Sequence, residues 1–491
     1  MNRFGTSVFA ILAATSSSAL AATWHVSPSG NDAAAGSDTA PFKTIQRAVT
    51  AANAGDTVLV HAGTYLGFQV MKSGTASAPL TVKAEAGVNI NGAGTTDRDA
   101  IHVENASYVI IDGFTVTGAT RSGISSITSD HITIRNNRSD QNAKWGVFSA
   151  FTDELLVENN ELSRNVAQHG VYASNSADHP IIRGNYIWGN GMCGVHMNGD
   201  VSIQPGDGII SNAVVENNII VDNGALGGSG INGDGVRNAI IRNNVIDGNH
   251  ASGISLYMID GGGASTGNQV INNTIRQASN GRAAINIQDG STGNTLRNNI
   301  ILHPSTSKPA IDICATCITG TVSNNNALVG RFMKGGTMID LAAWRSQTGN
   351  DMASMVASDS DLFTSTTDLS LKAGSMAIDA GNATGAPSVD INGTARPQGA
   401  GIDIGAYEHC EGTCSGTTGG GDDGGGAGDG SGSGDGSGSG DGTGDGSGSD
   451  YTGPVTDPAD GTGGCSAGGG SPGLLVFVLA GLVMRRRMRD F

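Results

Sequence analysis

Short runs of alternating apolar and polar residues recur through the middle of this chain of 491 residues. Each run opens with Gly or Ala followed by Val or Ile. Strict alternation over a few residues predicts β-strands, and the repeats lack the 3.6-residue period of an amphipathic helix. The opening pairs are Gly123-Ile124, Gly146-Val147, Gly170-Val171, Gly194-Val195, Gly230-Ile231, Gly253-Ile254, Ala284-Ile285 and Ala310-Ile311.

A pair of asparagines recurs in the same register, preceded by an apolar and a variable residue. Asn and Gly tolerate left-handed backbone geometry and therefore suit corners. Units that repeat at this period bury their apolar faces only against their neighbours. We therefore predict an all-β solenoid of short parallel strands, a β-helix. The copies lie at 134–137, 157–160, 215–218, 241–244, 270–273 and 296–299, with a degenerate copy at 181–185.

These two patterns resemble the right-handed parallel β-helix repeat proteins, the broad group that contains the pectate lyases. The resemblance covers roughly residues 24–330. It implies a right-handed parallel β-helix but does not choose a reaction, because one fold hosts many activities.

The segments before and after the repeats have their own signatures. Residues 1–22 combine Arg3, an apolar stretch and a small-residue site, which predicts a secretory signal peptide. Residues 23–100 should form the N-terminal cap and first rungs. There the spacing of Ile45, Ala48, Val49 and Ala52 predicts a helix that covers the exposed strand edge. The repeats should occupy 101–330 and a closing segment 331–414, with a short helix within 341–351.

The last part of the chain changes composition sharply. Residues 415–464 are nearly all Gly, Ser, Thr and Asp, which predicts a disordered linker, and their nine Asp carry much of the net charge of −17. Residues 465–491 hold Cys465, a short apolar run and an Arg cluster, which resembles the myxobacterial C-terminal sorting signal. That resemblance implies cleavage and lipidation near Cys465, and a plain membrane tail is the alternative. We expect a secreted monomer anchored at the cell surface or outer membrane, with membrane contact through this segment only.

The other cysteines fit an exported protein. Cys410 and Cys414 can form a small disulfide loop, whereas a bond between Cys314 and Cys317 would be short and strained. Cys193 is expected to be packed against its surroundings.

Side chains that alternate with the core residues should form outward ladders. With Val195 and Met197 inside, His196 and Asn198 point outward, and matching positions in stacked strands lie ~4.8 Å apart. Between residues 172 and 288 these ladders are polar, and insertions at 201–211 and 258–267 leave one corner to wall a groove. The first ladder reads Ser125, Phe148, Tyr172, His196, Asn232, Ser255, Asn286, Asp312, and the second Ile127, Ala150, Ser174, Asn198, Asp234, Tyr257, Gln288, Cys314.

The resemblance to pectate lyases implies cleavage of uronic-acid polymers by β-elimination, in which a cation neutralises the carboxylate and a base removes the C5 proton. His196 is the predicted base, with His169 and Arg282 behind it. Calcium needs oxygen ligands, for which Asp200 and Asp234 are the candidates, joined by Asp207 or Asp260. The polysaccharide would contact Tyr172, Asn198, Asn232, Tyr257, Asn286 and His250.

The sequence departs from the best-known pectate lyases in two ways. No cluster of consecutive acidic residues marks the calcium site, and no lysine falls on the polar ladders, Lys144 being the nearest. His169 and His250 also suit turns, and Tyr172 and Tyr257 can simply cover the sheet.

Several functions therefore stay open. A glycoside hydrolase could use Asp200 and Asp234 as its carboxylate pair. A non-catalytic glycan-binding or adhesin-like protein would use the same groove, and a purely structural spike would need no site. The acidic chain has no basic stripe, which argues against nucleic acid as a partner.

Overall fold

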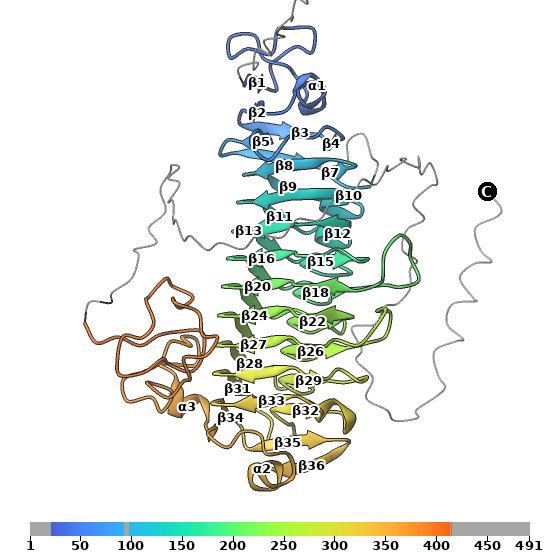
Figure 1. The fold of residues 1–491 in the computed structure, drawn as a ribbon. Helices are drawn as coiled ribbons and strands as arrows, with labels where there is room; N and C mark the ends of the chain where they lie inside the picture. Colours follow the sequence, from blue (N-terminus) through green and yellow to red (C-terminus); the bar gives the residue numbers. More distant parts are fainter. Residues whose placement is uncertain (1–20, 93–97, 413, 415–491) are drawn as a thin grey trace, which may run out of the picture.

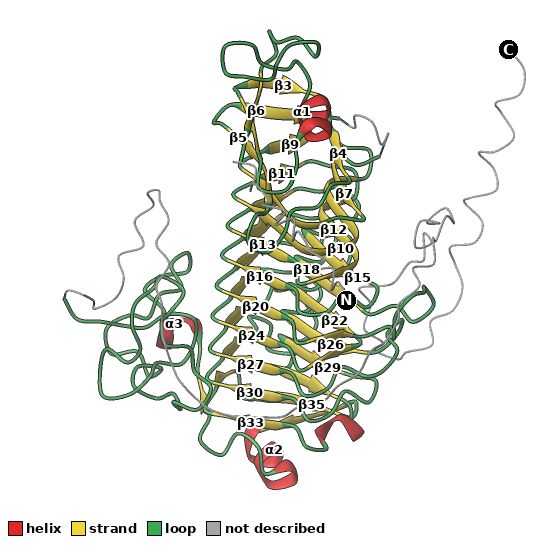
Figure 2. Cartoon of the chain, turned by 45° about the horizontal axis from the view of Figure 1, so that its top comes forward, coloured by secondary structure: helices red, strands yellow, loops and turns green. Residues whose placement is uncertain are grey.

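A computed structural model describes residues 21–92, 98–412 and 414. Their strands wind into a long coil of three parallel stacks, seen side-on in Figure 1 and tilted in Figure 2. The predicted linker and sorting segment, and residues 1–20 of the predicted signal peptide, lie outside the described residues. The described part forms a parallel β-helix, as the repeats predict.

Each turn of the coil contributes one strand to each stack. The first stack comprises β4 (Phe68–Val70), β7 (Ile101–Glu104), β10 (Ser122–Arg135), β12 (Trp145–Asp153), β15 (Val171–Ser174), β18 (Val195–Asn198), β22 (Ile231–Asp234), β26 (Ile254–Tyr257), β29 (Ile285–Ile287), β32 (Ile311–Ile313) and β35 (Arg331–Lys334).

The second stack shares the long strand β10. It comprises β1 (Thr23–Val26), β2 (Thr57–Val60), β5 (Leu80–Ala84), β8 (Ser107–Asp112), the C-terminal half of β10, β13 (Leu156–Glu158), β16 (Ile181–Arg183), β20 (Val214–Glu216), β24 (Ile240–Arg242), β27 (Gln269–Ile271), β30 (Thr295–Arg297) and β33 (Val322–Asn324).

The third stack comprises β3 (Gly63–Tyr65), β6 (Val88–Asn91), β9 (Thr115–Thr117), β11 (Arg138–Asp140), β14 (Glu161–Ser163), β17 (Tyr186–Trp188), β21 (Ile219–Val221), β25 (Val245–Asp247), β28 (Thr274–Arg276), β31 (Ile300–Leu302), β34 (Ala327–Leu328) and β37 (Met355–Val356). Most strands point one apolar side chain or more into the coil, and stacked rows of Val, Ile and Leu such as Val157, Ile182, Val215 and Ile241 form a continuous core.

The asparagine pairs divide into two roles at the corner after the second stack. The first Asn adopts a left-handed backbone, as at Asn217 (φ 56°) and Asn243 (φ 54°). The second is buried, and its side-chain oxygen accepts the backbone N–H and the side-chain N–H of the equivalent Asn one turn earlier, at 2.9–3.2 Å. This ladder runs through Asn137, Asn160, Asn185, Asn218, Asn244, Asn273, Asn299 and Asn326.

Helices and hairpins lie at the two ends of the coil. Helix α1 (Ile45–Ala51) lies beside β1 and β4, with Thr44 accepting the N–H of Arg47 as its N-cap. At the other end β36 (Thr337–Asp340) pairs antiparallel to β35, and α2 (Leu341–Thr348) is the short helix predicted there. Trp344 of α2 stacks on Phe332 with ring centroids 4.7 Å apart.

A C-terminal lobe packs against the side of the coil (Figure 1). It contains α3 (Asp359–Leu362), and residues such as Leu362, Phe363 and Ile404 bury themselves against Ile300 and Leu302 of the third stack. Asparagines of the corner pairs also hold it, since Asn243, Asn272 and Asn298 donate side-chain N–H groups to the backbone of Val389, Asp403 and Asn382. The lobe therefore lies alongside the last turns.

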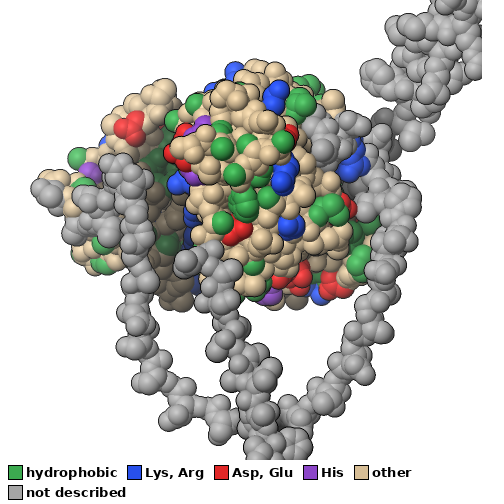
Figure 3. Space-filling view, turned by 90° about the horizontal axis from the view of Figure 1, so that it is seen from above, with side chains coloured by type: hydrophobic (Ala, Val, Ile, Leu, Met, Phe, Trp, Pro, Cys, Tyr) green, Lys and Arg blue, Asp and Glu red, His purple; other side chains and the backbone are tan. Residues whose placement is uncertain are grey.

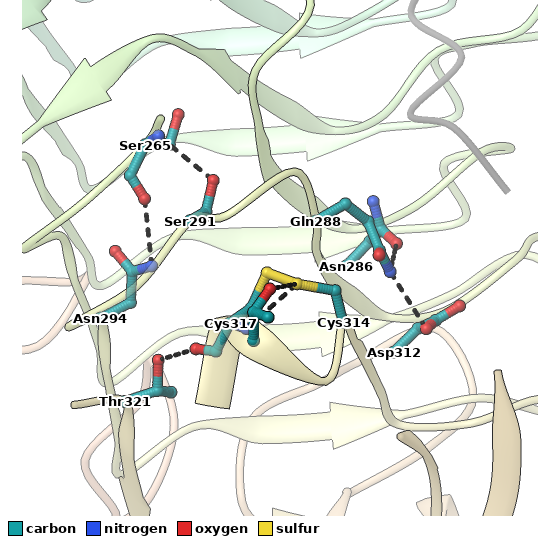
Figure 4. The surroundings of a disulfide bond; sticks show 10 residues. Ser265, Asn286, Gln288, Ser291, Asn294, Asp312, Cys314, Cys317 and Thr321 are labelled. Atoms are coloured by element: carbon teal, nitrogen blue, oxygen red, sulfur yellow. Dashed lines mark hydrogen bonds between the residues drawn. A yellow bond between two sulfur atoms is a disulfide. The ribbon is translucent and has the colours of Figure 1, made fainter. Parts of the chain in front are cut away.

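Two short disulfides close tight loops. Cys410 bonds to Cys414, and Cys314 bonds to Cys317 next to the 3₁₀ turn Thr316–Ile318. Figure 4 shows the second of these beside Asn286, Gln288 and Asp312. Within residues 21–92, 98–412 and 414, no helix is long and apolar enough to cross a membrane.

We predict that Asn244→Ala destabilises the coil strongly. The change removes the side chain that accepts from Asn218 and donates to Val215 and Asn273, leaving buried groups unpaired at about 1–3 kcal/mol each. Asn217→Gly is the matched control, because Gly keeps the left-handed backbone and the oxygen of Asn217 has no partner. Chemical denaturation should show a large decrease in the free energy of unfolding for Asn244→Ala only. Equal losses would contradict the ladder's role.

Candidate functional site

The outward ladders have the predicted register. Tyr172 pairs with His196, His196 with Asn232, Asn232 with Ser255 and Ser255 with Asn286. In the second ladder Asn198 pairs with Asp234 and Asp234 with Tyr257. Tyr172, Asn198, Asn232, Asp234, Tyr257 and Asn286 therefore occupy neighbouring turns on one face of the first stack.

Two loops stand beside this face. They follow β18 and β26 and project on the same side of the coil in Figure 1. They also touch each other, because Val201 N–H donates to Asp260 O (2.9 Å) and Gly262 N–H donates to Gly208 O (2.7 Å). The short strand β19 (Ile210–Ser211), at the end of the first loop, pairs with β23 (Val236–Arg237), and Arg237 in turn forms a bridge with Thr266 of the second loop. The two insertions do form one wall.

Asp234 anchors the second loop. Its carboxylate accepts the backbone N–H groups of Ile259, Asp260 and Gly261 at 2.8–3.1 Å, and its side chain is buried. Burial raises the pKa of Asp234, although these three hydrogen bonds act in the opposite direction. As a candidate metal ligand, Asp234 thus has much of its hydrogen-bonding capacity already used.

His169 and His196 form a buried pair. His169 Nδ1 accepts the backbone N–H of Cys193 (3.1 Å), and His169 Nε2 lies 3.2 Å from His196 Nδ1. A neutral imidazole carries one proton, so His169 must hold it on Nε2 and donate to His196. His196 therefore accepts at Nδ1 and carries its own proton on Nε2, which has no partner among the described residues.

Burial keeps both rings neutral. It lowers the pKa of His196 to about 3, and burial together with His196 lowers the pKa of His169 well below its usual value of 6.5. The tautomer derived above makes His196 a hydrogen-bond donor toward the outward face. A base at this atom would need the reverse tautomer, which opposes the Cys193 hydrogen bond.

Tyr172 lies next to this pair. Its ring centroid is 5.1 Å from that of His196, and its hydroxyl oxygen accepts Asn198 Nδ2–H at 3.0 Å. Burial raises the pKa of Tyr172, with the charges of Asp200, Asp260 and Asp234 acting in the same direction. The phenol is therefore neutral, and its proton is free to point toward a ligand.

Asp260 and Asp200 are the acidic pair of the two loops. Burial raises the pKa of Asp260, and the charge of Asp200 raises it further. Asp200 Oδ1 accepts the N–H and hydroxyl of Ser202 at 2.8 and 2.5 Å. Asp207 accepts the N–H of Ile209, so it holds its own loop. Asp260, which the sequence offered only as an additional calcium ligand, is therefore a stronger base than an ordinary aspartate.

Other predicted residues lie apart from the histidine pair. Burial lowers the pKa of Arg282, whereas the charges of Tyr257 and Asp312 act in the opposite direction. His250 binds Asp222 Oδ1 (3.0 Å) and Asn280 Oδ1 (3.2 Å) at a partly exposed corner.

The Tyr257 hydroxyl accepts Asn232 Nδ2–H, and Asn286 accepts Gln288 Nε2–H (3.1 Å; Figure 4). Asp312, which also accepts from Gln288 (3.1 Å), closes the polar face.

Comparisons with known proteins agree with this architecture. A family model described as a right-handed β-helix region matches residues 164–328, and one described as a periplasmic copper-binding protein (NosD) matches residues 49–204. The pectate lyase PEL9 of Emericella nidulans is 40% identical over 116 residues, spanning 20% of this chain and 28% of that protein.

Solved structures extend the likeness along the coil. The crystal structure of pectate lyase Pel9A has a TM-score of 0.56 at 21% identity, covering 79% of this chain and 96% of that one. An alginate lyase from Paenibacillus sp. is more distant, with a TM-score of 0.44 at 20% identity over 54% of this chain and 94% of its own. The described part of the chain is a right-handed parallel β-helix. Over 116 residues its sequence is similar to that of a pectate lyase.

The neutral histidine pair predicts an acid-sensitive fold. Below about pH 6.5 an unfolded histidine binds a proton, but His196 stays neutral until about pH 3, so stability is present above pH 6.5 and is lost as pH falls. The loss should be about 1.4 kcal/mol per pH unit for each such histidine. Urea denaturation at pH 8, 7, 6 and 5 should show a shallower acid slope in His196→Gln. An unchanged slope would mean that His196 does not stay neutral.

Proposed function

We propose that this chain is a polysaccharide-active protein that binds a uronic-acid-containing polymer along the outward face of β15 to β29 and cleaves it by β-elimination. One observation carries the proposal. Four buried polar atoms on this face lack hydrogen-bond partners: His196 Nε2, Asn198 Oδ1, Asn232 Oδ1 and Asn286 Nδ2.

Unpaired buried polar atoms are costly and rare in a stable protein, so a cluster of them indicates a missing polar partner. Sugar hydroxyls and carboxylates supply both donors and acceptors and would pair with all four atoms. Because the atoms are buried, binding requires the site to open. The similarity to a pectate lyase supports a polysaccharide as the ligand.

The chemistry follows from the protonation states. His196 Nε2–H would hydrogen-bond to the sugar carboxylate and stabilise the negative charge that develops when C5 loses its proton. Asp260, whose raised pKa makes it a stronger base than an ordinary aspartate, would take that proton. The C5–H electrons form the C4–C5 double bond, the C4–O bond breaks, and the leaving oxygen takes the proton of Tyr172. This proposal moves the role of base from His196 to Asp260.

Calcium fits this site only in part. Ca²⁺ takes six to eight oxygen ligands. Asp200 and Asp260 offer two carboxylates, whereas Asp234 already accepts three backbone N–H groups. Because Asp260 cannot hold the ion and act as the base at once, we propose that a bound Ca²⁺ would sit on Asp200 together with substrate oxygens, where it would neutralise substrate charge, and no step above depends on it.

A glycan-binding protein without catalysis is the second candidate, because the same unpaired atoms would serve recognition alone. The glycoside hydrolase reading is less well supported, since Asp234 is buried under its loop. We further propose that the protein works outside the cytoplasm, anchored through its C-terminal segment. The Cys314–Cys317 and Cys410–Cys414 disulfides support that location, because disulfides persist in oxidising compartments.

The test is an assay of the purified chain on pectate, alginate and glycosaminoglycans, with calcium or with chelator, following the ultraviolet absorbance of unsaturated sugar ends. We expect absorbance to rise on one polymer and the rate to fall by about 10²–10⁴-fold in His196→Ala and Asp260→Asn. His131→Ala is the control, because His131 lies three turns away on Asp130.

The outcomes separate the candidates. No absorbance rise and no new reducing ends, with retained binding of a polymer, would favour the glycan-binding protein. New reducing ends without absorbance would favour a hydrolase. The proposal would be overturned if the chain neither bound nor cleaved any of these polymers.

A further inference from the structure

A second group of polar side chains lies at the N-terminal end of the coil, far from the polar face. His25 belongs to β1, His61 directly follows β2, and Asp38 comes from the loop between β1 and α1. Their atoms His25 Nδ1, His61 Nε2 and Asp38 Oδ1 face one another, and all three residues are at least partly exposed. Figure 3 views this end and shows histidine and acidic side chains adjoining at the surface.

The hydrogen bonds around His61 define its protonation state. His61 Nδ1 lies 3.1 Å from Glu85 Oε2, and a carboxylate only accepts, so Nδ1 carries the proton. His61 Nε2 then presents a lone pair toward His25 Nδ1, 3.1 Å away. Asp38 adds a carboxylate oxygen 3.5 Å from His25 Nδ1 and 3.8 Å from His61 Nε2. In this arrangement His25 Nδ1 carries its proton and donates to His61 Nε2. With that proton moved to His25 Nε2, two nitrogen lone pairs and a carboxylate oxygen from three segments would face one point.

The spacing of these atoms fits a metal ion. A triangle with sides of 3.1, 3.5 and 3.8 Å has its centre roughly 2.0 Å from each corner, and Zn²⁺ bonds to histidine nitrogen and carboxylate oxygen at about 2.0–2.2 Å. Two imidazoles with one carboxylate suit the first-row transition metals from nickel to zinc. Glu85 would fix the orientation of His61, as carboxylates behind metal-bound histidines do.

We propose that His25, Asp38 and His61 form a transition-metal site, with Glu85 as the positioning residue and a water-accessible fourth position. The ion would tie the loop that carries Asp38 to the first two strands of the second stack. Since β1 ends that stack, the metal would hold the terminal strand and its neighbouring loop on the coil. This site is independent of the proposed lyase chemistry.

The test is calorimetric titration of the full chain, carrying a histidine-free affinity tag, with Zn²⁺, Ni²⁺ and Cu²⁺ after chelator treatment. We expect one ion per chain, with affinity at least 100-fold weaker in His61→Ala and Asp38→Asn, and about 10–100-fold weaker in Glu85→Gln. Asp38→Asn is included because its side chain is 75% exposed, so the variant should fold. Thermal unfolding should shift upward with metal in the wild type but not in His61→Ala or Asp38→Asn.

Two controls separate this site from other histidines. His131→Ala removes an exposed histidine, and His196→Ala disrupts the buried group formed by His169, Cys193 and His196. Both should keep the metal affinity of the wild type. The proposal would be overturned if His196→Ala were the variant that lost metal binding while His61→Ala kept it. It would also be overturned if the wild type bound none of the three ions.

Discussion

The structure depends on buried asparagine amides that hydrogen-bond to one another from turn to turn. An unpaired amide in this position would be expensive, so each Asn needs an equivalent Asn in the next turn. Asn137 to Asn326 satisfy this requirement in an unbroken row. A second row from Asn142 through Asn165, Asn190 and Asn223 to Asn249 does the same at the next corner. These rows fix the corner in each turn and therefore fix the register of every strand that follows.

Fixed register explains why the polar face could be located from the sequence. Once Val195 and Met197 are inside, the period of two sends His196 and Asn198 outward, and the parallel pairing brings Asn232 and Asp234 alongside. The same repeat placed the Asn pairs at corners, and the structure then divided each pair into a left-handed corner residue and a buried ladder residue. Residues whose place depends on periodicity were thus predictable at the level of single side chains.

Contacts made by irregular segments were not predictable in this way. From the sequence, Asp234 and Asp200 are equal candidates for a calcium ligand. In the structure the carboxylate of Asp234 instead holds the loop after β26, and that loop places Asp260 beside Asn198. The tautomer of His196 depends on the backbone N–H of Cys193, which no side-chain pattern reveals. Likewise the lobe that uses Asn243 and Asn272 packs on the side of the coil through loop geometry. Such features arise from insertions, which the repeat leaves unconstrained.

This separation between coil and insertion bears on the chemistry. Between Tyr172 and Gln288 most ladder positions supply neutral donors and acceptors, with the anchored carboxylate of Asp234 as the exception. Asp260, a carboxylate whose pKa burial raises, is instead carried by a loop. A chain without a run of consecutive acidic residues can therefore still bring a base to a uronic acid, provided that the loop carries it. The rows would then recognise the polymer, and the loops would decide whether it is bound or cut.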